Sequence, residues 1–158
     1  MRHVFGVILL FIAGIASAAP VTWTLNGVTF DDGGTATGQF DYDADLKQYS
    51  NVSITTSFVN EYPSQIYNLA EPADSSPTSL YAWSIESPGA LVLFFIGSPA
   101  AAGDTVEIAT TSYEVYGEFP VERYVTSGTV SSVPIPAAVW LFGSALAGLG
   151  WLRRKQTA

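Results

Sequence analysis

The chain has 158 residues, with 14 Asp and Glu against six Lys and Arg and one His, for a formal charge of −8. That length accommodates one domain of moderate size with short appendages. The acidic balance argues against a nucleic-acid partner. The sequence contains no Cys, which excludes a disulfide framework, a thiolate nucleophile and a thiolate metal site.

The N-terminus has the three-part form of a secretory signal peptide. Residues 1–3 are a short basic start, residues 4–15 are apolar, and Ala16 and Ala18 put small residues at the −3 and −1 positions of a cleavage site. The apolar run is too short to span a membrane, and a core helix rarely begins a chain in this way. We therefore expect residues 1–18 to be a signal peptide cleaved after Ala18, and the protein to be exported.

The C-terminal residues, 133–158, have the pattern of a membrane segment with a basic end. Residues 133–152 are mostly apolar, and Arg153, Arg154 and Lys155 follow them. Twenty helical residues rise about 30 Å, the thickness of a hydrocarbon core. Since basic residues beside a membrane helix stay in the cytoplasm, the pattern predicts a membrane-stop signal with the preceding residues outside the cytoplasm.

A short proline motif stands at the start of this segment. It consists of Val133, Pro134, Ile135, Pro136 and Ala137. The two prolines block a helix and leave an extended segment, which suits a protease or a plain linker. Followed by the apolar stretch and the basic triplet, the motif resembles the PEP-CTERM sorting signal, most closely its VPLPA-CTERM variant.

That resemblance implies a location and a partner. Members of the family are exported proteins of Gram-negative bacteria, held transiently at the inner membrane by the C-terminal helix. An exosortase, a membrane-embedded cysteine protease, recognises them, and they reach the cell surface or the exopolysaccharide matrix of a biofilm. Ile135 stands where the namesake motif has Glu, which leaves open whether the motif is cleaved. Residues 21–43 are also similar to the opening of many such exported proteins, but that similarity carries no active site.

Residues 19–132, between the two ends, have the pattern of short β-strands. Apolar residues alternate with polar ones in several stretches, and turn residues separate them. Asn26-Gly27 predicts a hairpin turn, and Asp31-Asp32-Gly33-Gly34 predicts another. With further strands at 105–117 and 121–130, the sequence predicts about eight strands in an all-β domain, a β-sandwich or jelly roll.

The core of this domain is expected around a few large side chains. We expect Trp23, Phe40 and Trp83 in the core, together with residues 90–96. The stretch 90–96 is continuously apolar, which favours a strand buried on both faces.

The charges of the middle segment exclude several enzyme classes. All 14 acids lie within 19–132, where Lys47 and Arg123 are the only basic residues, so this segment carries −12. It contains no His and no Cys, which excludes a Ser-His-Asp triad, a Cys-His pair and a His-ligated metal. Pairs of carboxylates meet by chance among so many acids, so they give no sign of glycoside hydrolysis. We expect a protein that is not an enzyme.

Asp41, Asp43 and Asp45 are the candidate metal ligands. Alternating carboxylates supply the hard oxygen ligands that Ca²⁺ prefers. The segment is not an EF-hand, because Leu46 and Val52 stand where Gly and Glu are required. Turn formation by the same Asp residues is the competing interpretation. No cofactor other than Ca²⁺ is indicated.

Two functional classes remain open from the sequence. The first is a non-enzymatic surface or matrix protein associated with exopolysaccharide. The second is a carbohydrate-binding or Ca²⁺-dependent adhesive module with a defined site. Aromatic side chains are the candidates for stacking on sugar rings, although β-sheet packing explains most of them; they are Tyr62, Tyr67, Tyr81, Trp83, Tyr113, Tyr116 and Tyr124.

Overall fold

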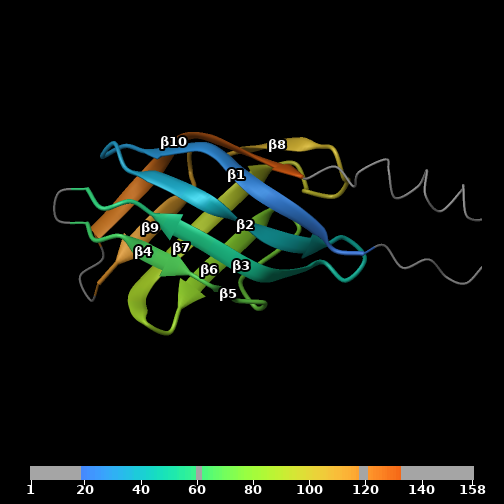
Figure 1. The fold of residues 1–158 in the computed structure, drawn as a ribbon, viewed down its shortest axis with the longest axis horizontal. Helices are drawn as coiled ribbons and strands as arrows, with labels where there is room; N and C mark the ends of the chain where they lie inside the picture. The colour runs from blue at the N-terminus through green and yellow to red at the C-terminus, as the bar shows by residue number, and fades with distance from the viewer. Residues whose placement is uncertain (1–18, 60–61, 118–120, 133–158) are drawn as a thin grey trace, which may run out of the picture.

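A computed structural model of the chain describes residues 19–59, 62–117 and 121–132 (Figure 1). The predicted signal peptide, the proline motif, the C-terminal helix and the basic triplet lie outside these residues. Within the described ranges, no helix is long and apolar enough to cross a membrane.

The described residues form ten strands, which confirms the all-β prediction. The predicted strand at 105–117 is two shorter strands, and the two short strands β4 (Gln65–Tyr67) and β5 (Leu69–Ala70) were not predicted. In chain order the strands are β1 (Val21–Phe30), β2 (Thr35–Asp43), β3 (Gln48–Thr56), β4 (Gln65–Tyr67), β5 (Leu69–Ala70), β6 (Ser79–Ser84), β7 (Ser87–Ile96), β8 (Thr105–Ile108), β9 (Tyr113–Tyr116) and β10 (Val121–Ser132).

The strands pair antiparallel in the order β4-β3-β2-β1-β10-β8-β7-β6-β5, and β9 pairs with both β10 and β7. Strand β10 is shared: residues 121–124 pair with β9, and residues from 125 onward pair with β1 and β8. Strand β7 is shared in the same way between β9 and β8. Figure 1 shows β1, β2 and β3 crossing over β6 and β7, an arrangement consistent with a sandwich of two layers.

The core lies between these layers. Trp23 and Phe40 are fully buried there, as predicted, and the ring of Phe40 on β2 lies 5.8 Å from that of Phe95 on β7. Alternation in β2 and β3 places every second side chain inward, also as the sequence predicts.

The hairpin predicted at Asn26-Gly27 is wrong. Strand β1 continues through both residues, and the pairing register shifts there against β2 and against β10. Gly27 has a φ of 58°, whereas Asn26 is not among the residues of positive φ. A type I′ turn needs positive φ at both positions, so the dipeptide forms a bulge inside a strand instead.

Burial of residues 90–96 on both faces is confirmed for only part of the strand. Residues 90–93 are buried, but Phe94 is 37% and Ile96 is 61% exposed. The end of β7 pairs with β8, where the outward face meets solvent.

Candidate functional site

A charged cluster lies inside the domain around Arg123 of β10. This side chain is 2% exposed, and its guanidinium carbon lies 4.3 Å from the ring centre of Phe30 and 4.2 Å from that of Tyr62. Glu114, opposite it on β9, is fully buried. Its Oε2 accepts a hydrogen bond from Arg123 Nε at 2.6 Å and forms an ion pair with Arg123 Nη2, also at 2.6 Å. The pair is therefore a buried salt bridge between adjacent strands.

The other Glu114 oxygen is also used. Its Oε1 accepts from Thr56 Oγ1 of β3 at 2.8 Å and from the Tyr67 hydroxyl of β4 at 2.7 Å. Because β3 and β4 belong to one layer and β9 to the other, Glu114 ties the two layers together.

Arg123 makes two further contacts at the same end of the domain. Its Nη1 donates to Asp32 Oδ2 at 3.1 Å, and its Nη2 donates to the carbonyl oxygen of Ser57 at 3.2 Å. Asp32 lies in the turn predicted at residues 31–34, where its Oδ1 accepts from the Gly34 amide at 2.8 Å. The turn is thus confirmed, and its second Asp has a partner that the local pattern does not reveal.

The acidic neighbours of Arg123 keep its guanidinium protonated. Burial alone lowers the pKa of the Arg123 guanidinium, but Glu114 and Asp32 outweigh it and raise that pKa above its ordinary value. Burial, then Glu114, raises the pKa of Tyr67, so its hydroxyl remains a neutral donor. With the Glu114 oxygens and all three Arg123 nitrogens engaged within the fold, we interpret the cluster as structural. One feature of the sequence could have pointed to this cluster: Arg123 is one of only two basic residues in 19–132, among 14 acids.

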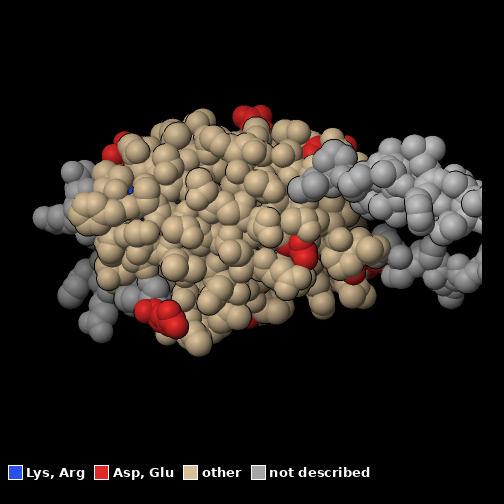
Figure 2. All heavy atoms as spheres, viewed as in Figure 1, with Lys and Arg blue, Asp and Glu red and all other residues tan. Residues whose placement is uncertain are grey.

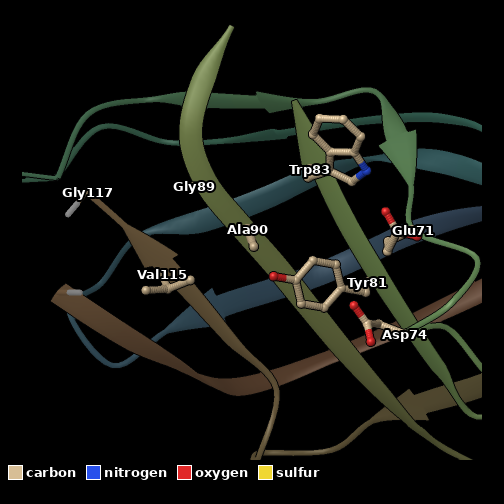
Figure 3. A pocket seen from close by; sticks show the side chains of 8 residues that line it. All are labelled: Glu71, Asp74, Tyr81, Trp83, Gly89, Ala90, Val115 and Gly117. Atoms are coloured by element: carbon tan, nitrogen blue, oxygen red, sulfur yellow. The ribbon is translucent and has the colours of Figure 1, made fainter. Parts of the chain in front are cut away.

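A second feature is a hollow on the outer surface of β6, β7 and β9, which we call the outer groove (Figure 3). Its volume of about 500 Å³ is in the range of ligand sites, about 300–1,000 Å³. Leu80 and Ala82 of β6 point into the core, so the alternating residues Tyr81 and Trp83 face outward. The lining residues are Glu71, Asp74, Tyr81, Trp83, Gly89, Ala90, Val115 and Gly117.

The strand register explains why this surface is hollowed. Two parallel rows of outward side chains cross the sheet. The first row is Trp83, Ala90 and Val115, and the second is Tyr81, Val92, Tyr113 and Tyr124. Because small residues stand beside Trp83 in the first row, the surface falls away next to the indole ring. Figure 3 shows Tyr81 and Trp83 side by side, with Ala90 and Val115 on one side of them and Glu71 and Asp74 on the other.

Two carboxylates make one side of the groove negative. Glu71 is fixed at the edge of β6, because its amide donates to the carbonyl oxygen of Tyr81 at 2.9 Å. Asp74 is exposed. Burial raises the pKa of the Tyr81 hydroxyl, and nearby Tyr113 raises it further. The charges of Asp74 and Glu71 act on that pKa in the same direction.

Trp83 is not in the core, contrary to the sequence prediction. It is half-buried and forms part of the groove wall. An outward position on a strand places it on the far side of the sheet from Leu80 and Ala82. Its Nε1 is buried and has no hydrogen-bond partner in the described part of the chain. The Nε1 of Trp23 in the core is likewise buried without such a partner among the described residues, so this feature does not by itself mark the groove.

The aromatic side chains predicted as candidates for stacking on sugar rings lie in different places in the structure. Tyr67 and Tyr62 are buried and belong to the Arg123 cluster, while Tyr81 and Trp83 line the groove. Tyr124 pairs with Tyr113 beyond it, with 6.2 Å between their ring centres.

Asp41, Asp43 and Asp45 do not gather into a metal site. Among residues 19–59, 62–117 and 121–132, no three acidic side chains come close enough together to hold a metal ion. Asp41 accepts from Thr22 Oγ1 at 2.6 Å and from Asn51 Nδ2 at 2.7 Å. Asp43 Oδ1 accepts from two backbone amides of the following turn, each at 2.9 Å. The contacts of Asp43 match the turn interpretation, whereas those of Asp41 join β2 to its neighbours β1 and β3. Calcium binding itself stays a prediction.

No protein-family model matches this chain, and neither a curated protein nor a solved structure is significantly similar to it. The function is therefore argued from its own residues.

Proposed function

We propose that the protein is an exported, non-enzymatic surface or extracellular-matrix protein with a β-sandwich domain. An exosortase-type membrane protease sorts it through the C-terminal signal, and the domain then associates with exopolysaccharide. One observation carries the proposal: a proline motif at 133–137, an apolar stretch and the triplet 153–155 occur in that order after the domain.

The described domain supports this proposal in two ways. Its most buried charges, Arg123 and Glu114, are used to join the layers of the fold rather than to line a cleft. The segment 19–132 also lacks His and Cys, the commonest general base and the most reactive nucleophile. A display protein needs neither.

The test is the intact mass of the protein recovered from cells and from the extracellular fraction of its host. We expect the extracellular form to lack residues 1–18 and a C-terminal piece that begins near Pro136. Replacing Pro134 and Pro136 with Ala should retain the protein at the inner membrane. An unaltered C-terminus in a protein found only at the inner membrane would contradict the sorting proposal.

The alternative is a carbohydrate-binding module with a defined site, and the outer groove is the observation that favours it. Aromatic side chains beside polar groups in an open hollow are typical of sites that orient a ligand by a few polar contacts. The two candidates differ in an observable: a defined site gives saturable binding that one substitution abolishes.

A further inference from the structure

We propose that the outer groove binds a glycan segment bearing a protonated amino group, with a sugar ring against Tyr81 and Trp83 and the ammonium group beside Glu71 and Asp74. The proposal rests on the proposed association with exopolysaccharide and names the chemical class of the partner.

The shape of the groove suits a sugar ring. Tyr81 and Trp83 are two residues apart on β6, so they project from the same face about 7 Å apart. Ala90 and Val115, on the neighbouring strands, are too small to cover them. An aromatic surface that is open on one side accepts the flat, C–H-bearing face of a pyranose.

The charge of the groove selects the sugar. Its described lining holds two carboxylates and no Lys or Arg. Carboxylates form strong, charge-assisted hydrogen bonds with an ammonium group, and aromatic faces also attract cations. The opposite face of the domain, formed by β1, β2 and β3 and drawn in Figure 2, also shows scattered acidic side chains and only a small spot of Lys or Arg, so the negative charge is not confined to the groove. A polysaccharide of uronic acids would be repelled, whereas an amino sugar is attracted.

The polar atoms on the groove surface suit a saccharide. The Tyr81 hydroxyl points toward Ala90 along the groove (Figure 3), whereas the Trp83 Nε1 is buried below the groove surface. A sugar hydroxyl can accept a hydrogen bond from the Tyr81 hydroxyl or donate one to it. The ammonium of Lys can donate to the Tyr81 oxygen, and a peptide carbonyl can accept from the Tyr81 hydroxyl, so the binding of oligolysine is the comparison that separates a basic peptide from a saccharide.

Binding of short glucosamine oligomers tests the proposal. Calorimetric titration would use the full-length protein in a detergent without a sugar headgroup, at mildly acidic pH, where the amine is protonated. The matched probe is the fully N-acetylated oligomer of the same length, which has the same rings without the charge. We expect the acetylated oligomer to bind at least about tenfold more weakly, because the charge-assisted hydrogen bonds are lost.

Substitutions test the carboxylates and the aromatic surface of the groove separately. Asp74→Asn and Glu71→Gln should each weaken glucosamine binding and leave binding of the acetylated oligomer unchanged. Tyr81→Ala should weaken binding of both. The controls are Glu107→Gln, an exposed acid on β8, and Phe58→Ala, an exposed aromatic outside the groove; neither should change binding.

Three results would overturn the proposal: equal affinity for the two oligomers, equally tight binding of oligolysine, or binding that the groove substitutions leave intact. The binding measurements do not depend on whether the protein is sorted, because the intact-mass experiment tests sorting separately. A correctly sorted protein without amino-sugar binding would refute only the groove proposal, and binding by an unsorted protein would refute only the sorting proposal.

Discussion

Arg123 shows how one residue can hold the two layers of the domain together. A cation in a segment of charge −12 has many acidic partners available at the surface, yet this one is buried between two aromatic rings. Burying an ion pair costs desolvation energy, which is recovered only with good geometry and additional hydrogen bonds. Glu114 meets both conditions through its contacts with Thr56 and Tyr67.

Replacing Glu114 with Gln should strongly destabilise the protein. The substitution keeps the shape of the side chain but removes the charge that compensates the buried Arg123. Loss of one partner of a buried pair typically costs about 3–5 kcal/mol. The free energy of unfolding from urea denaturation measures the effect. The matched control is Glu107→Gln, since Glu107 is exposed on β8. Equal urea midpoints for the two variants would show that the buried pair adds no stability.

At the scale of a strand, two glycines mark where β1 and β2 depart from regular pairing. Gly27 has a φ of 58° and no atom within 4 Å of the position a Cβ would occupy. Gly38 has a φ of 132°, and a Cβ there would lie 2.0 Å from the carbonyl oxygen of Ser53 on β3. Both positions strain an L-residue, but only the second also brings it against a neighbouring backbone.

Gly38→Ala should therefore cost more stability than Gly27→Ala. At Gly27 the expected loss in the free energy of unfolding is about 1–2 kcal/mol, which is the cost of holding an L-residue in a left-handed conformation. At Gly38 the clash with Ser53 is added, and overpacking in a closely packed site typically costs about 1–3 kcal/mol more. Urea denaturation of the two variants, compared under the same conditions, gives the order. A smaller loss at Gly38 would mean that β2 and β3 separate easily at this point.

The strands were predictable from sequence where alternation decides which side chain is inward. Residues 35–42 and 51–56 have a period of two, and their buried positions follow it. The Asn26-Gly27 bulge was not predictable, because the same dipeptide suits a hairpin and a bulge, and pairing with distant β10 decides between them. The prediction that Trp83 lies in the core was wrong because it rested on the size of the side chain. Which face of β6 is buried depends on the layer against which that strand packs, and Trp83 lies on the other face. The groove depends on register between strands, which local patterns do not encode.

At the scale of the whole molecule, the dominant property is unbalanced negative charge. Residues 19–132 carry 14 acids and two basic residues, one of which is buried in its own ion pair. Like charges on one compact domain repel each other, which destabilises the folded state relative to the expanded chain. Salt screens this repulsion over a distance that falls from about 30 Å at 0.01 M to about 8 Å at 0.15 M.

Added salt should therefore raise the thermal midpoint of unfolding. A gain of about 1 kcal/mol would appear as a rise of about 4 °C or more in a domain of this size. Screening depends on ionic strength, so CaCl₂ and MgCl₂ at matched ionic strength should give equal increases. Asp41 and Asp43 already accept hydrogen bonds from the protein, which favours this outcome over a resident calcium ion. A further, saturable increase with CaCl₂ that Asp43→Asn abolishes would instead establish a calcium site at residues 41–45. A calcium ion that bridges the acidic domain to an acidic glycan would then become the better account of matrix association.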